Sequence, residues 1–254
     1  MIGNFDSGVG GLSVFREIRK VLPEQSYIYY SDNAHCPYGE KSREYIIDRA
    51  REITRFMLEK GCEIIVIACN TATAAAINTL RDEFPVKFIG MEPAIKPAAQ
   101  STKTGVVGVL ATAGTLKASK YLDTREKWAQ NVKIAEHIGQ GFVELVETGN
   151  ISSPSAEETV RASLIPLLEA GADTIVLGCT HYPFLISTIE EVAHDAFPQR
   201  SINVIDPAPA VARHLIEVMK EDNISEKSAS GYSIELLSSG DPANLQRTFE
   251  SLLK

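Results

Sequence analysis

Short runs of apolar and β-branched residues alternate with longer amphipathic stretches along most of the chain. Short apolar runs are typical of buried strands, and apolar residues that recur every three or four positions are typical of helices. The pattern predicts strands at 2–5, 27–31, 64–68, 86–90, 104–110, 132–135, 173–177, 203–205 and 233–236. It predicts helices at 11–21, 43–60, 71–83, 116–128, 156–170, 183–197, 209–220 and 242–253. Regular strand–helix alternation indicates an α/β fold with parallel sheets covered by helices on both faces.

One segment of the chain occurs twice. Residues 59–70 align without gaps on residues 169–180, and both copies contain the same Glu, Gly, Ile, Val and Cys at matching positions. Two shorter matches keep the same order along the chain, 2–7 with 107–112 and 92–94 with 206–208. Three ordered matches indicate an internal duplication. We therefore predict two similar parallel-sheet α/β domains related by pseudo-two-fold symmetry, with the active site in the cleft between them. Their predicted boundaries are 1–92 plus 207–254, and 93–206.

The duplication places one cysteine after the same strand in each domain, Cys69 and Cys179. Asn70 and Thr71 follow Cys69 at the start of a predicted helix. Thr180 and His181 follow Cys179, with Pro183 where the first turn of a helix accepts proline, so both thiols are predicted to lie at helix N-termini. A thiol at a helix N-terminus ionises more readily, because the helix dipole and the free amides favour the thiolate. The same amides bind an anionic group such as a carboxylate.

Two thiols in matching positions suit proton transfer on opposite faces of one carbon. A thiolate on one side removes a proton while a thiol on the other side delivers one, and the roles reverse for the mirror-image substrate. We find no pyridoxal signature, so the sequence favours a route without a cofactor. Any single cysteine can instead be a small buried hydrophobic residue without a catalytic role, and this is our interpretation of Cys62. A shared zinc site is disfavoured because the C-x-x-C spacing is missing.

Other segments offer groups that would contact a ligand. The glycine-rich turn 6–11 follows the first strand, and Asp6 there would orient or receive a proton. It lacks both the third glycine of a dinucleotide fingerprint and the Gly-Lys-Ser/Thr of a P-loop. Tyr38 and Gly39 lie in a predicted loop and would contact a ligand there. The alternative is that the segment only forms a turn and binds nothing. His181 is either a capping or a catalytic residue, and Glu147 is either a solvated helix residue or part of the site.

Composition narrows the class of protein further. The chain has 254 residues and a net charge of −8, which disfavours binding to nucleic acid. Its longest aliphatic run, 64–68, is too short to cross a membrane. Four cysteines and no visible signal peptide indicate free thiols in the cytoplasm.

The motifs together resemble the glutamate racemases of the aspartate/glutamate racemase superfamily. The resemblance spans essentially the whole chain and is carried by the segments 5–12, 37–39, 68–73 and 178–183. It implies an isomerase that interconverts L- and D-glutamate without a cofactor or metal and supplies D-glutamate for peptidoglycan and cell-wall synthesis. Members of this family often pair, so a homodimer is one expectation.

The resemblance also implies roles for individual residues. Cys69 and Cys179 would be the two bases, one for each enantiomer, with Asp6 assisting Cys69, and His181 and Glu147 assisting Cys179. Substrate would be bound by Asp6, Ser7, Tyr38, Gly39, Asn70, Thr71, Thr180 and His181, and by Thr112, which mirrors Ser7 in the internal repeat.

Three alternatives stay open from the residues alone. The first is a related racemase or isomerase that acts on aspartate or a hydantoin. The second is a thiol hydrolase with Cys179 as nucleophile and His181 as base, which leaves Cys69 without a purpose. The third is an amino-acid-binding protein without catalytic activity.

Overall fold

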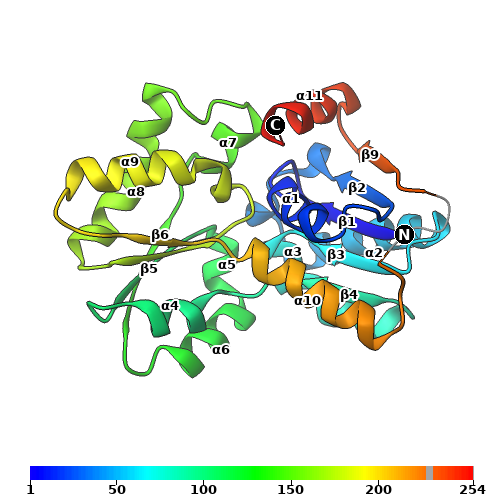
Figure 1. The fold of residues 1–254 in the computed structure, drawn as a ribbon, viewed down its shortest axis with the longest axis horizontal. Coiled ribbons are helices and arrows are strands. Elements are labelled where there is room, and N and C mark those ends of the chain that lie inside the picture. The colour runs from blue at the N-terminus through cyan, green and yellow to red at the C-terminus, as the bar shows by residue number, and fades with distance from the viewer. Residues whose placement is uncertain (227–230, 254) are drawn as a thin grey trace. The chain divides into compact units, whose positions relative to one another are not determined.

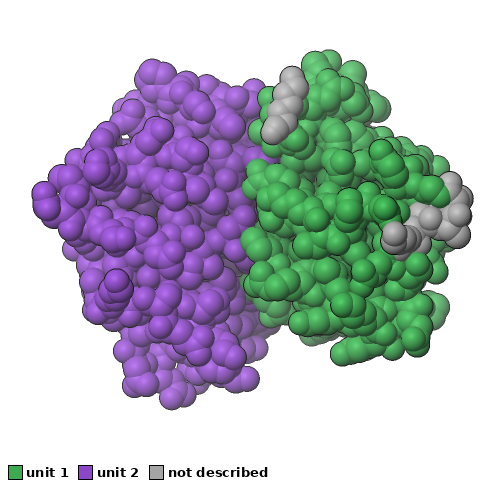
Figure 2. Space-filling model, viewed as in Figure 1, with its two compact units in different colours: residues 1–92, 208–254 green, residues 93–207 purple. Residues whose placement is uncertain are grey.

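The computed structural model describes residues 1–226 and 231–253, and the chain divides into two compact units (Figure 2). Unit 1 comprises residues 1–92 and 208–254, and unit 2 comprises residues 93–207. This division lies one residue beyond the 206/207 boundary predicted from the sequence.

Unit 1 is built on a five-stranded parallel sheet with the order β4-β3-β1-β2-β9 (Figure 1). Its strands are β1 (Ile2–Asp6), β2 (Tyr27–Ser31), β3 (Ile64–Ile67), β4 (Lys87–Gly90) and β9 (Ile234–Ser238). Its helices are α1 (Leu12–Val21), α2 (Arg43–Glu59), α3 (Asn70–Glu83), α10 (Ala208–Glu221) and α11 (Pro242–Leu252), with short 3-10 turns η1 (Asn33–His35) and η2 (Tyr38–Glu40).

Unit 2 holds a four-stranded parallel sheet with the order β6-β5-β7-β8. Its strands are β5 (Val106–Ala111), β6 (Lys133–Ile138), β7 (Thr174–Gly178) and β8 (Asn203–Ile205). Its helices are α4 (Ile95–Ser101), α5 (Ala113–Lys117), α6 (Ser119–Trp128), α7 (Phe142–Glu147), α8 (Pro154–Glu169) and α9 (Ile186–Ala196), with the 3-10 turn η3 (Tyr182–Leu185).

The sequence duplication has a counterpart in the sheets. The order β4-β3-β1-β2 in unit 1 is the order β8-β7-β5-β6 in unit 2, and β9 is an additional strand of unit 1. The register is also the same, because Ile2 pairs with Ile64, and their counterparts Val107 and Thr174 pair with each other. The predicted fold class of two parallel-sheet α/β domains is confirmed.

The central strands are buried on both faces, which explains their continuous apolar sequences. Every residue of β1 and β3 is buried. Gly3 on β1 lies against α2, since a Cβ there would stand 2.7 Å from the sulfur of Met57. Among the described residues, no helix combines the length and the apolar character needed to span a membrane.

The structure differs from the predicted elements where segments are short. The helix predicted at 116–128 is two helices, α5 and α6, because Ala118 between them has an extended backbone. The helix predicted at 183–197 begins as the 3-10 turn η3 and continues as α9. Two short helices, α4 and α7, were not predicted, since seven and six residues are too few to show helical periodicity.

Arg200 ties the end of α8 to the loop before β7, and we expect it to stabilise unit 2. Its guanidinium donates to the carbonyl oxygens of Leu168 and Ala172, each at 2.7 Å. Arg200→Met leaves both acceptors without this donor and should lower the free energy of unfolding by about 1–3 kcal/mol. Chemical denaturation measures the change. Arg161→Met, which removes an exposed pair with Glu157, is the control and should cost less than about 0.5 kcal/mol.

Candidate active site

Three polar side chains of unit 1 meet where neighbouring strands β1 and β3 end. Asp6 closes β1, Ser7 follows it, and Cys69 lies two residues after β3. The Cys69 thiol donates to Ser7 Oγ at 3.8 Å, and Ser7 Oγ donates to Asp6 Oδ1 at 3.4 Å. All three side chains are buried. A thiol, a hydroxyl and a carboxylate therefore form one continuous chain of contacts.

Backbone amides complete this half-site. Cys69 is the N-cap of α3, and its sulfur accepts from the amide of Ala72 at 3.4 Å. A cysteine in this position has its thiolate favoured by the positive end of the helix dipole. Asp6 Oδ2 accepts from the amide of Gly11 at 2.7 Å. Position 11 requires glycine, since a Cβ there would stand 2.6 Å from the Cβ of Asp6.

Asn70 and Thr71 are the first two residues of α3 and lie directly beside the thiol in sequence. Both are half-buried. The side-chain nitrogen of Asn70 is buried and has no hydrogen-bond partner among the described residues. Since buried donors are normally paired, this nitrogen is a candidate contact for a ligand.

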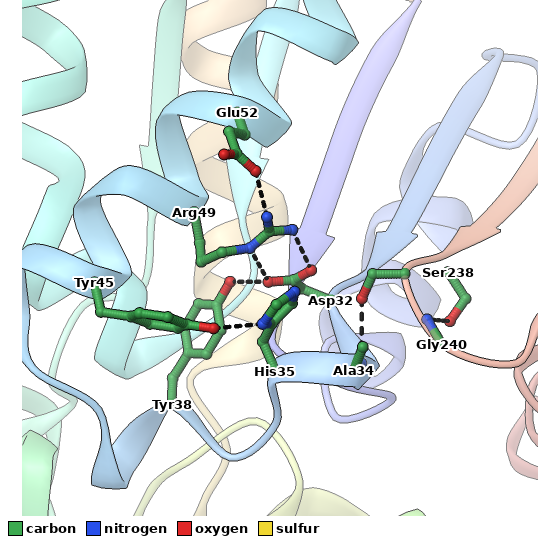
Figure 3. A network of polar contacts seen from close by, with 10 residues as sticks. Asp32, Ala34, His35, Tyr38, Tyr45, Arg49, Glu52, Ser238 and Gly240 are labelled. Carbon is green, nitrogen blue, oxygen red and sulfur yellow. Dashed lines mark hydrogen bonds and ion pairs between the residues drawn. The ribbon is translucent and has the colours of Figure 1, made fainter.

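Tyr38 and Gly39 lie on the turn η2 rather than in an irregular loop. Tyr38 is buried, and its hydroxyl donates to Asp32 Oδ2 at 2.5 Å. Arg49 of α2 donates to both oxygens of the same carboxylate, with Nε to Oδ2 at 2.9 Å and Nη2 to Oδ1 at 2.7 Å (Figure 3). The phenol of Tyr38 thus donates its hydrogen to Asp32, and its oxygen can still accept a hydrogen bond.

Our sequence analysis missed Asp32 and Arg49. A signal for Asp32 was present, because it follows strand β2 much as Asp6 and Ser7 end β1. Burial alone would raise the pKa of Asp32, but hydrogen bonds from Arg49, Tyr38 and Ser239 outweigh it and hold the pKa below its ordinary value of 3.8. Asp32 is therefore a buried carboxylate that stays ionised.

Asp32 is expected to contribute stability that disappears in acid. The pKa of Asp32 is lower in the folded protein than its ordinary value of 3.8. The contribution to stability is therefore fully present above pH 3.8 and is lost as the pH falls through the pKa of the folded state. Asp32→Asn should lower the free energy of unfolding by about 3 kcal/mol at neutral pH. Urea unfolding at stepwise lower pH should show this difference shrinking below pH 3.8. Asp48→Asn, at an exposed carboxylate paired with Arg51, should show little difference at any pH.

Unit 2 carries a second half-site of different composition. Cys179 follows β7, the counterpart of β3, and its sulfur lies 3.7 Å from Nδ1 of His181. Nε2 of His181 lies 2.6 Å from Oε1 of Glu147, on α7. Burial alone would lower the pKa of His181, but its contacts with Cys179 and Glu147 raise it well above the usual value. A charged imidazole would stabilise a thiolate beside it.

Two threonines complete this half-site. Thr180 is buried directly after Cys179. Thr112 follows β5 as Ser7 follows β1, and its hydroxyl caps α5 by accepting from the amide of Thr115 at 3.2 Å.

The two thiols differ in their relation to the following helix. We expected both at helix N-termini, and Cys69 does cap α3. Cys179 instead precedes the 3-10 turn η3, whose N-cap is His181, and α9 begins only at Ile186. Pro183 within η3 lacks the amide hydrogen that a helix would use there. The side chain of His181 therefore offers Cys179 the positive charge that a helix N-terminus offers Cys69.

Comparison with known proteins identifies the family. Residues 11–215 match the family described as Asp/Glu/Hydantoin racemase, which is most of the chain. The chain belongs to this family. It is therefore an enzyme, and as a racemase it is an isomerase.

Individual relatives align with this chain along nearly its full length. The glutamate racemase of Herpetosiphon aurantiacus is 45% identical over 251 residues, which cover 99% of this chain and 97% of the relative. A crystal structure of glutamate racemase from Bacillus anthracis superposes with a TM-score of 0.87 at 30% identity, covering 100% of this chain and 93% of that one. The Escherichia coli glutamate racemase, solved with L-glutamate and the activator UDP-MurNAc-ala, gives a TM-score of 0.84 at 35% identity, covering 97% and 94%. The resemblance drawn from the motifs is confirmed.

Proposed function

We propose that this racemase interconverts L- and D-glutamate by a two-base mechanism and thereby supplies D-glutamate for peptidoglycan synthesis. The observation that carries the proposal is the pair of buried thiols after the matching strands β3 and β7, each in contact with its own polar partners. Glutamate as the substrate is supported by the relatives named above, which are glutamate racemases, and by the L-glutamate bound to the E. coli neighbour. The other racemase substrates that the sequence left open have weaker support. The family description also covers aspartate and hydantoin racemases, but the solved aspartate racemase and its homologue are only 19% and 22% identical to this chain and share its fold alone.

The proposed reaction needs the two thiols to approach opposite faces of the α-carbon. In one direction the thiolate of one cysteine takes the α-proton, and the electron pair of the broken C–H bond stays on the carbon. The thiol of the other cysteine then delivers its proton to the opposite face, and that cysteine is left as the thiolate. The reverse reaction uses the same groups in exchanged roles, so no net proton is gained or lost.

The partners of each thiol have distinct tasks in this mechanism. Asp6, through Ser7, and the helix amides of α3 would orient Cys69 and stabilise its thiolate. His181, held by Glu147, would do the same for Cys179. Amides and the polar groups Asn70, Thr71, Thr112 and Thr180 would bind the two carboxylates of the substrate. We propose that this chemistry proceeds without a cofactor or metal.

The domains and the cellular location belong to the same proposal. We propose that the two compact units are the functional domains, each supplying one base. A cytoplasmic location fits the four cysteines, all of which are free thiols. Pairing into a homodimer is a further expectation that gel filtration would test.

Purified protein incubated with L-glutamate in deuterated buffer, without added cofactor, tests the function. We expect the circular dichroism of the amino acid to decay to zero while deuterium appears at its α-carbon by NMR. The same assay with L-aspartate distinguishes a different substrate from a different reaction. If the protein racemises aspartate but not glutamate, the proposed substrate is wrong. If it racemises neither amino acid, the proposed two-base reaction is wrong.

A further inference from the structure

A buried charged network surrounds the carboxyl end of β2 in unit 1. The side chain of Asp32 is fully buried, and its backbone amide donates to the carbonyl of Asp6 at 2.9 Å. Its carboxylate receives the forked guanidinium of Arg49 and the hydroxyl of Tyr38 (Figure 3). Ser239, which follows β9, adds a further hydrogen bond. One carboxylate thus joins β2, η2, α2 and the segment after β9.

The network reaches the half-site through Tyr38. The buried cluster that contains Tyr38 also contains Cys69, and the turn η2 packs against α3, the helix that Cys69 caps. Burial first, and then the negative charges of Asp32 and Cys69, raise the pKa of Tyr38 far above its ordinary value. The phenol therefore stays protonated and donates to Asp32 throughout the working pH range.

The arrangement has a geometric use, although removing one partner alone is costly because the other charge stays buried. A buried ion pair gives little net stability compared with well-packed apolar side chains, because removing both charges from water is costly. The ion pair does fix the orientation of the two side chains, because the planar guanidinium fits both oxygens of one carboxylate in a single geometry. The carboxylate is then fixed, and so is the hydroxyl that donates to it.

We propose that Arg49 and Asp32 are positioning residues that hold the turn of Tyr38 and Gly39 in place beside the Cys69 thiol. The inference rests on the proposed function, in which Cys69 is one of the two bases. Arg49 acts here through Asp32 and Tyr38. Because the contacts of Arg49 with Asp32 and Glu52 lie within unit 1, its loss should impair proton transfer by Cys69 more than proton transfer by Cys179.

The test begins with Arg49→Met, which keeps an unbranched side chain that fills the aliphatic part of arginine and removes the guanidinium. Misplacing a reacting group by about 1 Å costs up to about a hundredfold in rate, so kcat/KM should fall by about 10- to 100-fold. Arg49→Lys keeps the charge and loses the two-pronged contact, so it should restore only part of the loss. The matched control is Arg51→Met, on the same helix, whose arginine pairs with exposed Glu83 and Asp48. It should retain full activity.

Isotope effects separate positioning from general damage to the fold. The enantiomers have equal free energies, so kcat/KM must fall equally in both directions whatever the cause. With α-deuterated substrates, however, Arg49→Met should raise the primary isotope effect for the enantiomer whose proton Cys69 removes. For the other enantiomer the primary isotope effect should fall. Its α-proton is removed by Cys179, and the slow step becomes the later delivery of a proton by Cys69. A loss of folded enzyme changes neither isotope effect.

Each outcome then decides the proposal. Equal isotope effects in both directions, or kinetics of Arg49→Met that match those of Arg51→Met, would overturn it. If Arg49→Met does not fold, Tyr38→Phe removes only the oxygen that contacts Asp32, and the same asymmetry is expected with a smaller rate loss. The proposed function is tested separately by Cys69→Ser. If Cys69→Ser is inactive but the Arg49 and Tyr38 variants keep normal kinetics, only the positioning role is wrong. If Cys69→Ser is active, the two-base mechanism itself is wrong.

Discussion

Cys69→Ser and Cys179→Ser should each lower the turnover of glutamate in both directions by about 10²- to 10⁴-fold, the range of a lost general acid–base group. A serine hydroxyl keeps the shape of the thiol but does not ionise near neutral pH. Each direction needs one cysteine to accept a proton and the other to donate one. Loss of either thiol therefore stops both directions, although the fold should persist. Circular dichroism of the amino acid measures the rate from each enantiomer.

The single variants should also differ from each other in proton exchange. The cysteine that remains still faces one side of the α-carbon, so it should exchange the α-proton of one enantiomer with deuterated solvent without inverting it. Cys69→Ser and Cys179→Ser should favour opposite enantiomers in this exchange.

Cys62→Ala is the matched control for the two active-site variants. Cys62 is buried just before β3, at the amino end of the strand and not at the carboxyl end where Cys69 lies, and burial raises its pKa to about 11, so it stays a thiol at working pH. It should retain full turnover. Near-normal turnover by both strand-end variants would contradict the two-base mechanism.

His181→Asn is expected to have the second largest effect, a loss of about 100-fold in kcat/KM. His181 lies between Cys179 and Glu147, with its Nδ1 3.7 Å from the sulfur and its Nε2 2.6 Å from the carboxylate. Its raised pKa favours the imidazolium, which would stabilise the Cys179 thiolate and orient the thiol when it donates. Asparagine is too short and carries no charge, so it should lose both effects.

Two further measurements make this prediction specific. Primary isotope effects should become asymmetric, rising for the enantiomer whose proton Cys179 removes, which is the opposite sense to the asymmetry expected for Arg49→Met. Glu147→Gln keeps a hydrogen-bond acceptor for His181 and removes the charge, so its loss should be smaller than that of His181→Asn. Full activity of His181→Asn, with unchanged isotope effects, would show that Cys179 works without this imidazole.

Much of the fold could be predicted because it depends on local patterns. Strands such as β2 and β8 are found at the predicted residues, since a run of apolar residues bounded by turn residues is a local feature. The duplicated segment further predicted that β3 and β7 would be equivalent, and their registers agree. The short helices α4 and α7 could not be predicted, because they are held by packing rather than by periodicity.

The two arginines of α2 show what a sequence leaves undecided. Arg49 and Arg51 have the same side chain, two positions apart on the same helix, and each has acidic residues nearby in sequence. Their difference arises when α2 packs on the sheet, because residues two apart on a helix point in different directions. Arg49 then reaches the buried carboxylate after β2, and Arg51 pairs with Glu83 at the exposed end of α3.

The sequence by itself determined the α/β class, the duplication, and the two cysteines with the residues that follow them, because each is a pattern of neighbours along the chain. Only the tertiary structure decided which side chains each thiol meets. Ser7 and Cys69 are 62 residues apart, and Glu147 and His181 are 34 apart. Parallel strands that end at one edge bring such distant residues together, and that proximity depends on sheet order and helix packing rather than on local sequence.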